Sequence, residues 1–213
     1  MRKLVYLISA LLTVTLFVQI FTPTQKIQAQ TAKKIWDQPY PATIRVAVRE
    51  SRPGGEPDPR GRILYVMSIP FESYIRNVLP NEWLPSWHPE SLKAGAMAIK
   101  MFGWFHAYNP IEQDNQLFHV DNTVNFQVYR DGTDIPRTNA AFDEIRTLAY
   151  IEKDDDLVEL FYRAGYPNQA NYQYKNAQKM SQNGSHFLAD KQNYNMLQIL
   201  QFYYEGRKLI QIP

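Results

Sequence analysis

Residues 73–102 read SYIRNVLPNEWLPSWHPESLKAGAMAIKMF, and this stretch decides much of the fold. It places one carboxylate, Glu82, between two prolines and beside two tryptophans, just ahead of a run rich in small residues. Pro89 can open a helix, because its missing N–H would be unpaired there in any case, and Glu90 suits the positive end of the helix dipole. The pattern therefore predicts a helix from Pro89 to about Ala107, with small residues that let another element approach closely.

The residues just ahead of that carboxylate predict a second helix. Ser68 suits its N-cap position, where a short polar side chain accepts a hydrogen bond from the first turn. We expect the helix to end at Leu79, because the ring of Pro80 removes a backbone donor and clashes with the preceding turn. The chain from there to His88 is predicted to be irregular.

The chain before these helices carries a strand pattern of period two. Within residues 42–50, Ile44, Val46 and Val48 share one face, whereas the other face is polar apart from one alanine. Such alternation is typical of a half-buried strand. A loop rich in proline, glycine and charge follows at residues 51–61.

The remaining elements are predicted from shorter patterns and indicate a single α+β domain. No internal repeat or domain linker is visible, so we expect mixed short strands and several helices in one domain over 42–213, after a polar lead-in at 30–41. Strands are predicted at 62–67, 125–130, 148–152, 157–162 and 208–212, helices at 137–146, 181–190 and 194–203, and a loop at 166–179.

Residues 1–29 have the composition of a secretion signal. Two basic residues precede an almost wholly apolar run at 4–21, and Ala29 offers a small residue for cleavage. The run approaches the length of a membrane span, so an uncleaved N-terminal anchor is the alternative, and it would be the only contact with a membrane. Either way, we expect a secreted or cell-envelope protein that faces out of the cytoplasm.

Without that segment the chain is close to neutral. The 23 basic residues become 20, because Arg2, Lys3 and Lys26 lie in it, against 21 acidic residues. No basic patch for nucleic acid is indicated, and the many Tyr, Trp and Asn side chains suit an uncharged polar ligand such as a glycan. With no cysteine, the chain can form no disulfide, lipoprotein anchor or thiol nucleophile.

Glu82 is the leading candidate for catalysis. A carboxyl group in apolar aromatic surroundings is the simplest way to obtain a general acid near neutral pH, and Trp83 and Trp87 would lower the local polarity. The alternative is a solvated loop carboxylate that caps the following helix. The tryptophans can stack on sugar rings or simply fill the core, and the residues alone leave both alternatives open.

Four separate blocks of this sequence resemble the SpoIID/LytB family, which includes stage II sporulation protein D and the amidase-enhancer proteins. They are Ile44–Val48, the central stretch around Glu82, Gln127–Tyr129, and the segment from Lys179 to Gly206. In the central block the matching residues are Tyr74, Val78, Glu82, Trp87, Glu90, Leu92, Lys93, Ala94 and Ala96. The resemblance implies a SpoIID-like fold and peptidoglycan glycan strands as the partner.

The resemblance also implies a reaction. In the sporulation enzymes of this family, the glutamate that matches Glu82 is the catalytic acid of a lytic transglycosylase, which cleaves the bond between N-acetylmuramic acid and N-acetylglucosamine. That route uses the C6 hydroxyl of the muramic acid as an internal nucleophile, so one acid is enough. The candidate residues for substrate binding are Tyr74, Trp83, Trp87, Lys100, Gln127, Tyr129, Ser181 and Gln182.

One departure from the family concerns a metal. The zinc-containing members carry Cys, His and Cys where this chain has Val120, Asn125 and Phe126. Zinc needs Cys, His or carboxylate ligands, and the neighbouring Asp121 alone could not hold it. We therefore expect no metal at this place and no other cofactor.

Other departures leave activity open. Gly95 and Lys100 replace a glutamine and an arginine of the family, and residues 162–166 replace its Ser-Gly-Gly loop. The alternative is therefore a non-catalytic glycan-binding or amidase-enhancing protein, with a cell-wall amidase as a possible further partner. Polar partners for Glu82 from residues 162–166 and 176–182 would favour catalysis over binding alone.

Overall fold

The computed structural model describes residues 33–213, so the predicted signal or anchor at 1–29 lies outside the described residues. None of the helices in these residues combines the length and the hydrophobicity that a membrane span needs. The elements are η1 (Ile35–Asp37), β1 (Thr43–Arg49), β2 (Ile63–Pro70), α1 (Phe71–Glu82), α2 (Pro89–Ala107), β3 (Ile111–Gln113), β4 (Gln116–Phe118), β5 (Val120–Asp121), α3 (Pro136–Ile145), β6 (Leu148–Ile151), β7 (Tyr162–Arg163), α4 (Tyr172–Asn176), β8 (Met180–Ser181), α5 (Gln182–Gln192), α6 (Met196–Tyr203) and β9 (Lys208–Gln211).

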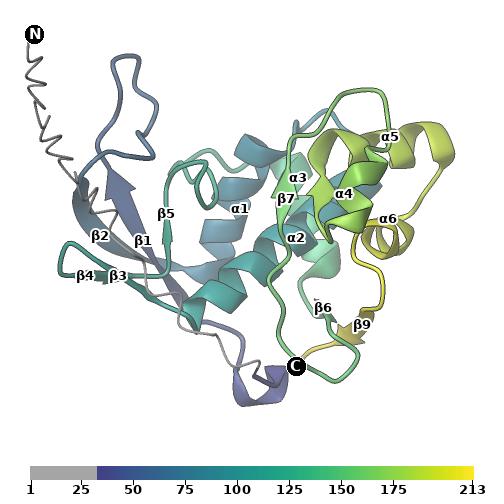
Figure 1. Ribbon diagram of the computed structural model, residues 1–213, viewed down its shortest axis with the longest axis horizontal. Helices are drawn as coiled ribbons and strands as arrows, with labels where there is room; N and C mark the ends of the chain where they lie inside the picture. Colours follow the sequence, from purple (N-terminus) through teal and green to yellow (C-terminus); the bar gives the residue numbers. More distant parts are fainter. Residues whose placement is uncertain (1–32) are drawn as a thin grey trace, which may run out of the picture. The chain divides into compact units, whose positions relative to one another are not determined.

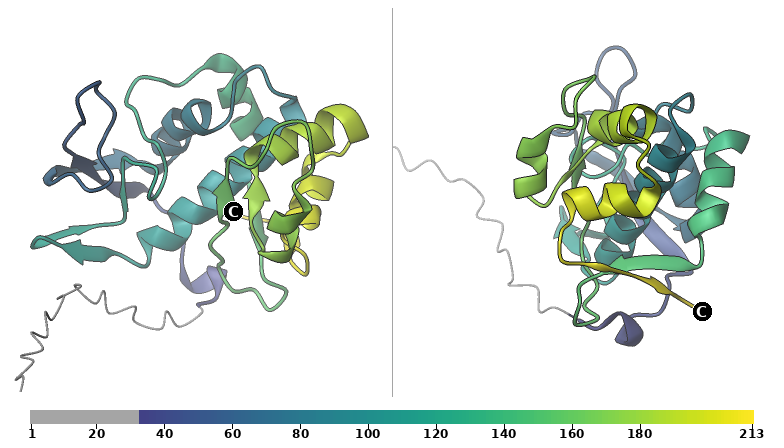
Figure 2. Two further views of the ribbon diagram at one scale, coloured as in Figure 1. Left: turned by 45° about the horizontal axis from the view of Figure 1, so that its top comes forward. Right: turned by 90° about the vertical axis from the view of Figure 1, so that its right-hand side faces the viewer.

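The strands form several small sheets, as expected for the predicted α+β class, which is confirmed. The largest has the order β2-β1-β5, with β1 antiparallel to β2 and parallel to β5. Three pairs of strands complete the set: β3-β4 and β6-β9 are antiparallel, and β7-β8 is parallel. Figure 2 shows β9 alongside β6.

Helix α2 is the centre of the fold, and its predicted bounds are confirmed. Figure 1 shows it between the β2-β1-β5 sheet and the helices α5 and α6. Most of its residues are buried, which the small side chains make possible. A Cβ atom on Gly95 would lie 2.5 Å from the indole ring of Trp83, and one on Gly103 would lie 2.9 Å from Phe71. These glycines therefore let α1 and Trp83, the residue that follows it, pack directly against α2.

The predicted start of α1 is wrong. Ser68 is not an N-cap, because it lies in β2 opposite Arg45, and the ladder with β1 continues to Pro70. The helix begins at Phe71, whose N–H donates to the carbonyl of Ala42. Residues that capping preference alone would place at the start of the helix therefore belong to β2, because they pair with β1.

The predicted end of α1 is also wrong, since the helix passes through Pro80 to Glu82. Pro80 has no N–H to donate to the preceding turn, and its ring crowds that turn. The turn is held by other bonds: the N–H of Trp83 donates to Leu79 at 2.8 Å, and the side-chain amide of Asn81 donates to the carbonyl of Asn77 at 2.7 Å. This extension places Glu82 on the last turn of a helix rather than in a loop.

Three further predictions differ from the structure. Residues 125–130 form no strand, and of 157–162 only the last residue enters one, β7. Helix α4 interrupts the predicted loop at 166–179, and the β3-β4 hairpin was not predicted. The other predicted elements are present with bounds that differ by a few residues.

Candidate functional site

Glu82 lies where α1 ends and the chain turns sharply into the core. The next residue, Trp83, is extended, with φ −118° and ψ 129°, and is fully buried. Glu82 itself remains partly exposed. Glu82 therefore lies at the edge of the core and remains accessible to solvent on one side.

Two neutral donors hold the carboxylate of Glu82. The backbone N–H of Val128 donates to Oε1 at 2.7 Å. The side-chain amide of Gln182, at the start of α5, donates to Oε2 at 3.0 Å and to the main-chain carbonyl of Glu82 at 2.6 Å. Because both oxygens are held from different segments, the orientation of the carboxyl group is fixed.

Strand β7 supplies two further neighbours. Tyr162 packs edge-on against Trp83, with ring centroids 4.9 Å apart. Its hydroxyl lies beside the Glu82 carboxylate but makes no hydrogen bond of standard geometry. Arg163 is exposed, its guanidinium donates to the carbonyl of Tyr162 at 2.9 Å, and its charge acts on Glu82. Polar partners thus come from both segments that the sequence analysis singled out.

The environment raises the pKa of Glu82. Burial is the largest influence and favours the neutral acid. The Val128 N–H, the Gln182 amide, the Tyr162 hydroxyl and the positive charge of Arg163 all favour the carboxylate, but they do not offset the burial. The result is a carboxyl group that keeps its proton to higher pH than an ordinary glutamate, which is what a general acid requires.

Three of the residues assigned to substrate binding lie together in the core instead of on the surface. The hydroxyl of Tyr74 donates to Gln127 Oε1 at 2.7 Å, and the rings of Tyr74 and Tyr129 stack with centroids 5.7 Å apart. All three side chains are buried. Gln127 is next to Val128, so this cluster supports the segment that donates to Glu82.

Ser181 and Gln182 stand at the start of α5. Ser181 is buried and caps the helix, its Oγ accepting from the N–H of Gly184 at 2.9 Å. The cap fixes the first turn, from which Gln182 reaches Glu82. Gln182 is therefore in contact with the candidate acid, and Ser181 stabilises the helix turn that carries Gln182.

The two tryptophans occupy different surroundings. Trp83 is fully buried, and its indole N–H donates to Ser185 Oγ at 3.1 Å, so it belongs to the core. Trp87 is partly exposed and stacks on His186, with centroids 5.2 Å apart and an interplanar angle of 4°. Of the two, only Trp87 presents part of its ring to solvent.

Lys100 is not brought to Glu82. It is 0% exposed, and its ammonium group donates to the carbonyls of Arg146 at 2.7 Å and Leu148 at 2.5 Å. Burial lowers its pKa to about 7. The side chain ties α2 to the end of α3 and the start of β6.

The place of the family's zinc ligands does not fit a metal. Val120 and Phe126 carry no ligand atom, and Asp121 is occupied, accepting from Arg49 Nε at 2.6 Å and from Thr123. Across residues 33–213, no group of three or more His, Asp or Glu side chains stands close enough to hold a metal ion.

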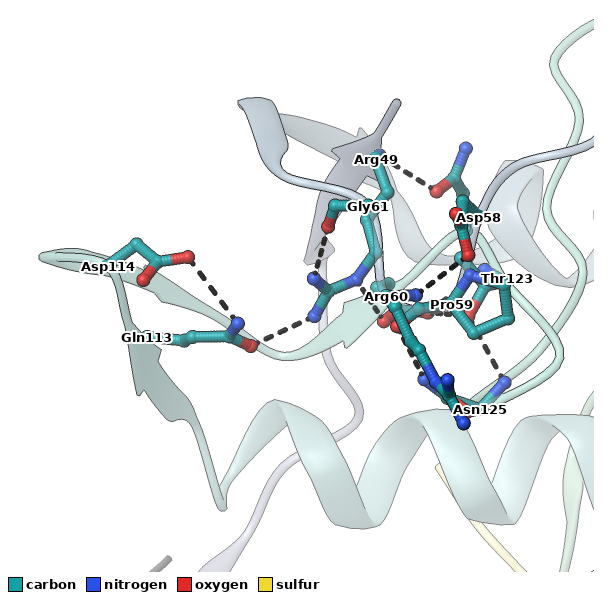
Figure 3. Close-up of polar contacts among 11 residues, drawn as sticks. Arg49, Asp58, Pro59, Arg60, Gly61, Gln113, Asp114, Thr123 and Asn125 are labelled. Atoms are coloured by element: carbon teal, nitrogen blue, oxygen red, sulfur yellow. Dashed lines mark hydrogen bonds and ion pairs between the residues drawn. The ribbon is translucent and has the colours of Figure 1, made fainter. Parts of the chain in front are cut away.

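A network of polar contacts holds this segment in the absence of suitable ligands. Arg49 is buried, and besides its ion pair it donates to the carbonyl of Gly61 and to Gln113, both at 2.9 Å. The amide of Asn125 donates to the carbonyl of Pro59 at 3.0 Å. Figure 3 shows these contacts, which join the loop at 51–61 to the segment that leads to Val128.

A shallow hollow of about 270 Å³ lies elsewhere and shares no residue with the surroundings of Glu82. Near it, Lys93 bridges Glu90 and Glu144. The hollow is lined by Glu90, Lys93, Glu144, Ile145, Leu148, Asn195, Met196 and Leu197.

Three of the groups around Glu82 were not predicted from the sequence. Val128 acts through its backbone N–H, which every residue but proline possesses, so no sequence pattern could identify it. Tyr162 and Arg163 lie in the segment at 162–166, which departs from the family pattern. Only their residue types could have indicated a role, because a hydroxyl and a cation can each interact with a carboxyl group.

Comparison with known proteins identifies a family and a relative. The family model described as "Stage II sporulation protein" (SpoIID) matches residues 59–193, more than half of the chain. An uncharacterized protein of Brachyspira hyodysenteriae is 38% identical over 68 residues, which are 32% of this chain and 18% of that protein. The chain thus matches less than a fifth of the length of this relative.

Proposed function

Because the chain belongs to the SpoIID family of stage II sporulation proteins, we propose that it acts on peptidoglycan outside the cytoplasm as a lytic transglycosylase. Family membership supports a role connected with sporulation or the cell wall. The observation that carries the finer proposal is the carboxyl group of Glu82, partly exposed, held by two donors and raised in pKa.

The first step is proton donation by Glu82. The neutral carboxyl gives its proton to the oxygen that links N-acetylmuramic acid to N-acetylglucosamine, and the bond between that oxygen and muramic C1 breaks. The carboxylate that remains is stabilised where it forms, because the Val128 N–H and the Gln182 amide already point at its oxygens.

The second step returns the proton. The muramic C6 hydroxyl attacks C1 while the Glu82 carboxylate takes its proton, giving a 1,6-anhydro product and restoring the neutral acid. No water and no second carboxylate are consumed, so a single glutamate can serve as acid and then as base.

The location rests on the sequence of residues 1–29. A basic start, an apolar run and a small residue for cleavage support export, either as a secreted protein or with an uncleaved anchor. Both alternatives put the domain in contact with glycan strands.

The experiment is a product assay on wall glycan, both peptide-bearing and peptide-stripped, with fragments identified by mass spectrometry. We expect the wild-type protein to release anhydro-muramic ends and Glu82→Gln to lose at least about 100-fold of this activity. The matched control is Glu152→Gln, which removes a carboxylate that pairs with Arg207 away from the site. Equal cleavage by wild type and Glu82→Gln would contradict the proposal.

A second candidate is a non-catalytic glycan-binding or amidase-enhancing protein. The observation that favours it is the position of Lys100, which replaces an arginine of the family. Lys100 is wholly buried, and its ammonium group donates to backbone carbonyls. Under this alternative, neither the wild type nor Glu82→Gln cleaves glycan, and both are retained by it in a pull-down.

A further inference from the structure

A chain of three buried polar side chains leads from the core to Glu82. Tyr74, on α1, donates its hydroxyl proton to Gln127 Oε1 at 2.7 Å, and both residues are 0% exposed. The amide nitrogen of Gln127 faces the carbonyl of Ile99 at 3.4 Å, a long contact. The Tyr162 hydroxyl lies beside the same amide and beside Glu82.

The orientation of the Gln127 amide decides what Tyr162 can do. The amide of Gln127 lowers the pKa of the Tyr162 hydroxyl, as a donor to the phenol oxygen does, so its NH₂ faces Tyr162 while Oε1 accepts from Tyr74. A phenol has one proton to donate and lone pairs that accept. When the amide donates to the oxygen of Tyr162, the phenolic proton is left for the carboxylate of Glu82.

The hydroxyl of Tyr162 is buried and makes no hydrogen bond of standard geometry. The side chain is only 5% exposed, and its oxygen makes no such bond with the described residues. Leaving a buried hydroxyl unpaired costs free energy, so such groups are uncommon in folded proteins. Its ring is fixed against Trp83, and its backbone pairs with Met180 across β7 and β8, so it cannot simply turn to solvent.

We propose that Tyr162 is a positioning residue for Glu82: its hydroxyl, oriented by Tyr74 and Gln127, donates to the carboxylate that forms when Glu82 releases its proton. The hydrogen bond strengthens as the charge appears, because a bond to a carboxylate is roughly twice as strong as one to a neutral group. The role in proton transfer to substrate rests on the proposed function. The coupling between Tyr162 and the ionisation of Glu82 does not.

The other groups that face Glu82 are all accounted for in this arrangement. The Val128 N–H and the Gln182 amide are neutral and cannot titrate, and Arg163 contributes a positive charge that favours the carboxylate. Burial raises the pKa of the Tyr162 hydroxyl well above its ordinary value of 10.0, so it remains a donor wherever the fold is stable. Of the two titratable groups, the carboxyl of Glu82 therefore loses its proton at a lower pH than the phenol of Tyr162.

The test is a carbon-13 NMR titration of the Glu82 carboxyl in the full chain, assigned by its loss in Glu82→Gln. We expect Tyr162→Phe to raise the pKa of Glu82 by about one unit, since the carboxylate loses one donor. Tyr74→Phe should raise it by less, because Gln127 can then rotate and accept the proton of Tyr162. Tyr150→Phe is the matched control, as its buried hydroxyl donates to the carbonyl of Tyr204 at 3.2 Å, away from Glu82.

An unchanged or lowered pKa of Glu82 in Tyr162→Phe would overturn the inference. If that variant does not fold, Tyr74→Phe provides the test. An unchanged pKa of Glu82 in Tyr74→Phe would show that Tyr74 and Gln127 do not orient the Tyr162 hydroxyl. The titration does not depend on glycan cleavage. If the wild-type protein cleaves no glycan but Tyr162→Phe shows the expected pKa shift, the proposed transglycosylase activity is refuted and the role of Tyr162 is supported. In an active protein, the loss of rate at high pH should move upward in Tyr162→Phe and stay in place in Tyr150→Phe.

Discussion

At the scale of single residues, the state of Glu82 is set by burial working against hydrogen bonding. Burial favours the neutral acid, and the donors around it favour the carboxylate. A carboxyl group under both influences keeps its proton to higher pH than an ordinary glutamate, and the carboxylate that forms when the proton leaves meets donors that are already in place. The same balance makes Glu82 costly to the fold when it is charged.

This cost predicts how stability depends on pH. The unfolded chain loses the Glu82 proton near the ordinary pKa of 4.5, whereas the folded chain keeps it to higher pH. Between the two values the folded state binds more protons, so the free energy of unfolding falls as the pH rises. Glu82→Gln should lack this fall, which urea unfolding of both proteins from about pH 4 to about pH 8 would measure. Parallel curves for the two proteins would contradict the prediction.

A second residue-scale feature is the pair Trp83 and Gly95. The indole lies against the backbone of α2 where a Cβ atom at Gly95 would stand 2.5 Å away. In the family pattern the position of Gly95 holds a glutamine, which could not coexist with the indole in this place. The buried tryptophan thus accounts for the missing side chain, and the departure at Gly95 reflects packing.

At the scale of elements, helix α5 positions Gln182 through its cap. Ser181 Oγ accepts from the N–H of Gly184, and the side chain of the next residue, Gln182, contacts Glu82. The cap thereby connects the stability of a helix end to the orientation of the candidate acid.

Ser181→Ala is expected to lower the free energy of unfolding by about 1 kcal/mol, the usual cost of losing a cap, and to reduce glycan cleavage. The control is Asn195→Ala, which removes the cap of α6, where Asn195 accepts from the N–H of Gln198 at 2.9 Å. Both variants should lose similar stability by urea unfolding, but only Ser181→Ala should lose activity. Equal activity in the two variants would show that the cap does not reach the site.

At the scale of the whole domain, the site depends on contacts between distant parts of the chain. Val128 and Gln182 lie 46 and 100 residues from Glu82 in the sequence. The segment that carries Val128 is in turn anchored by the buried ion pair of Arg49 and Asp121, which joins β1 to β5. Losing that pair would affect both the fold and the candidate acid.

Arg49→Met is expected to lower the free energy of unfolding by about 3–5 kcal/mol, because it removes the cationic partner of the buried Asp121. The control is Arg62→Met, which removes an exposed ion pair with Glu50 and should leave the unfolding curve unchanged. Urea unfolding measures both. A similar small effect for the two variants would contradict the structural role given to the buried pair.

Much of the fold could be predicted from the sequence, because it depends on local patterns. The bounds of α2 follow from Pro89 and the small residues after it, and β1 follows from the alternation at Ile44, Val46 and Val48. The predicted ends of α1 were wrong where tertiary contacts outweighed local preference: β1 pairs with Ser68, and other bonds hold the turn around Pro80. The absence of a strand at 125–130 has a similar cause, since the N–H of Val128 donates to a side chain.

The sequence by itself determined the single α+β domain, its central helix, its family and the choice of Glu82 as the candidate acid. Only the tertiary structure decided the environment of Glu82 and the burial of Lys100. The physical reason is that a carboxyl group's pKa and orientation depend on donors and burial contributed by distant segments. A backbone N–H such as that of Val128 leaves no trace in the residue type that carries it.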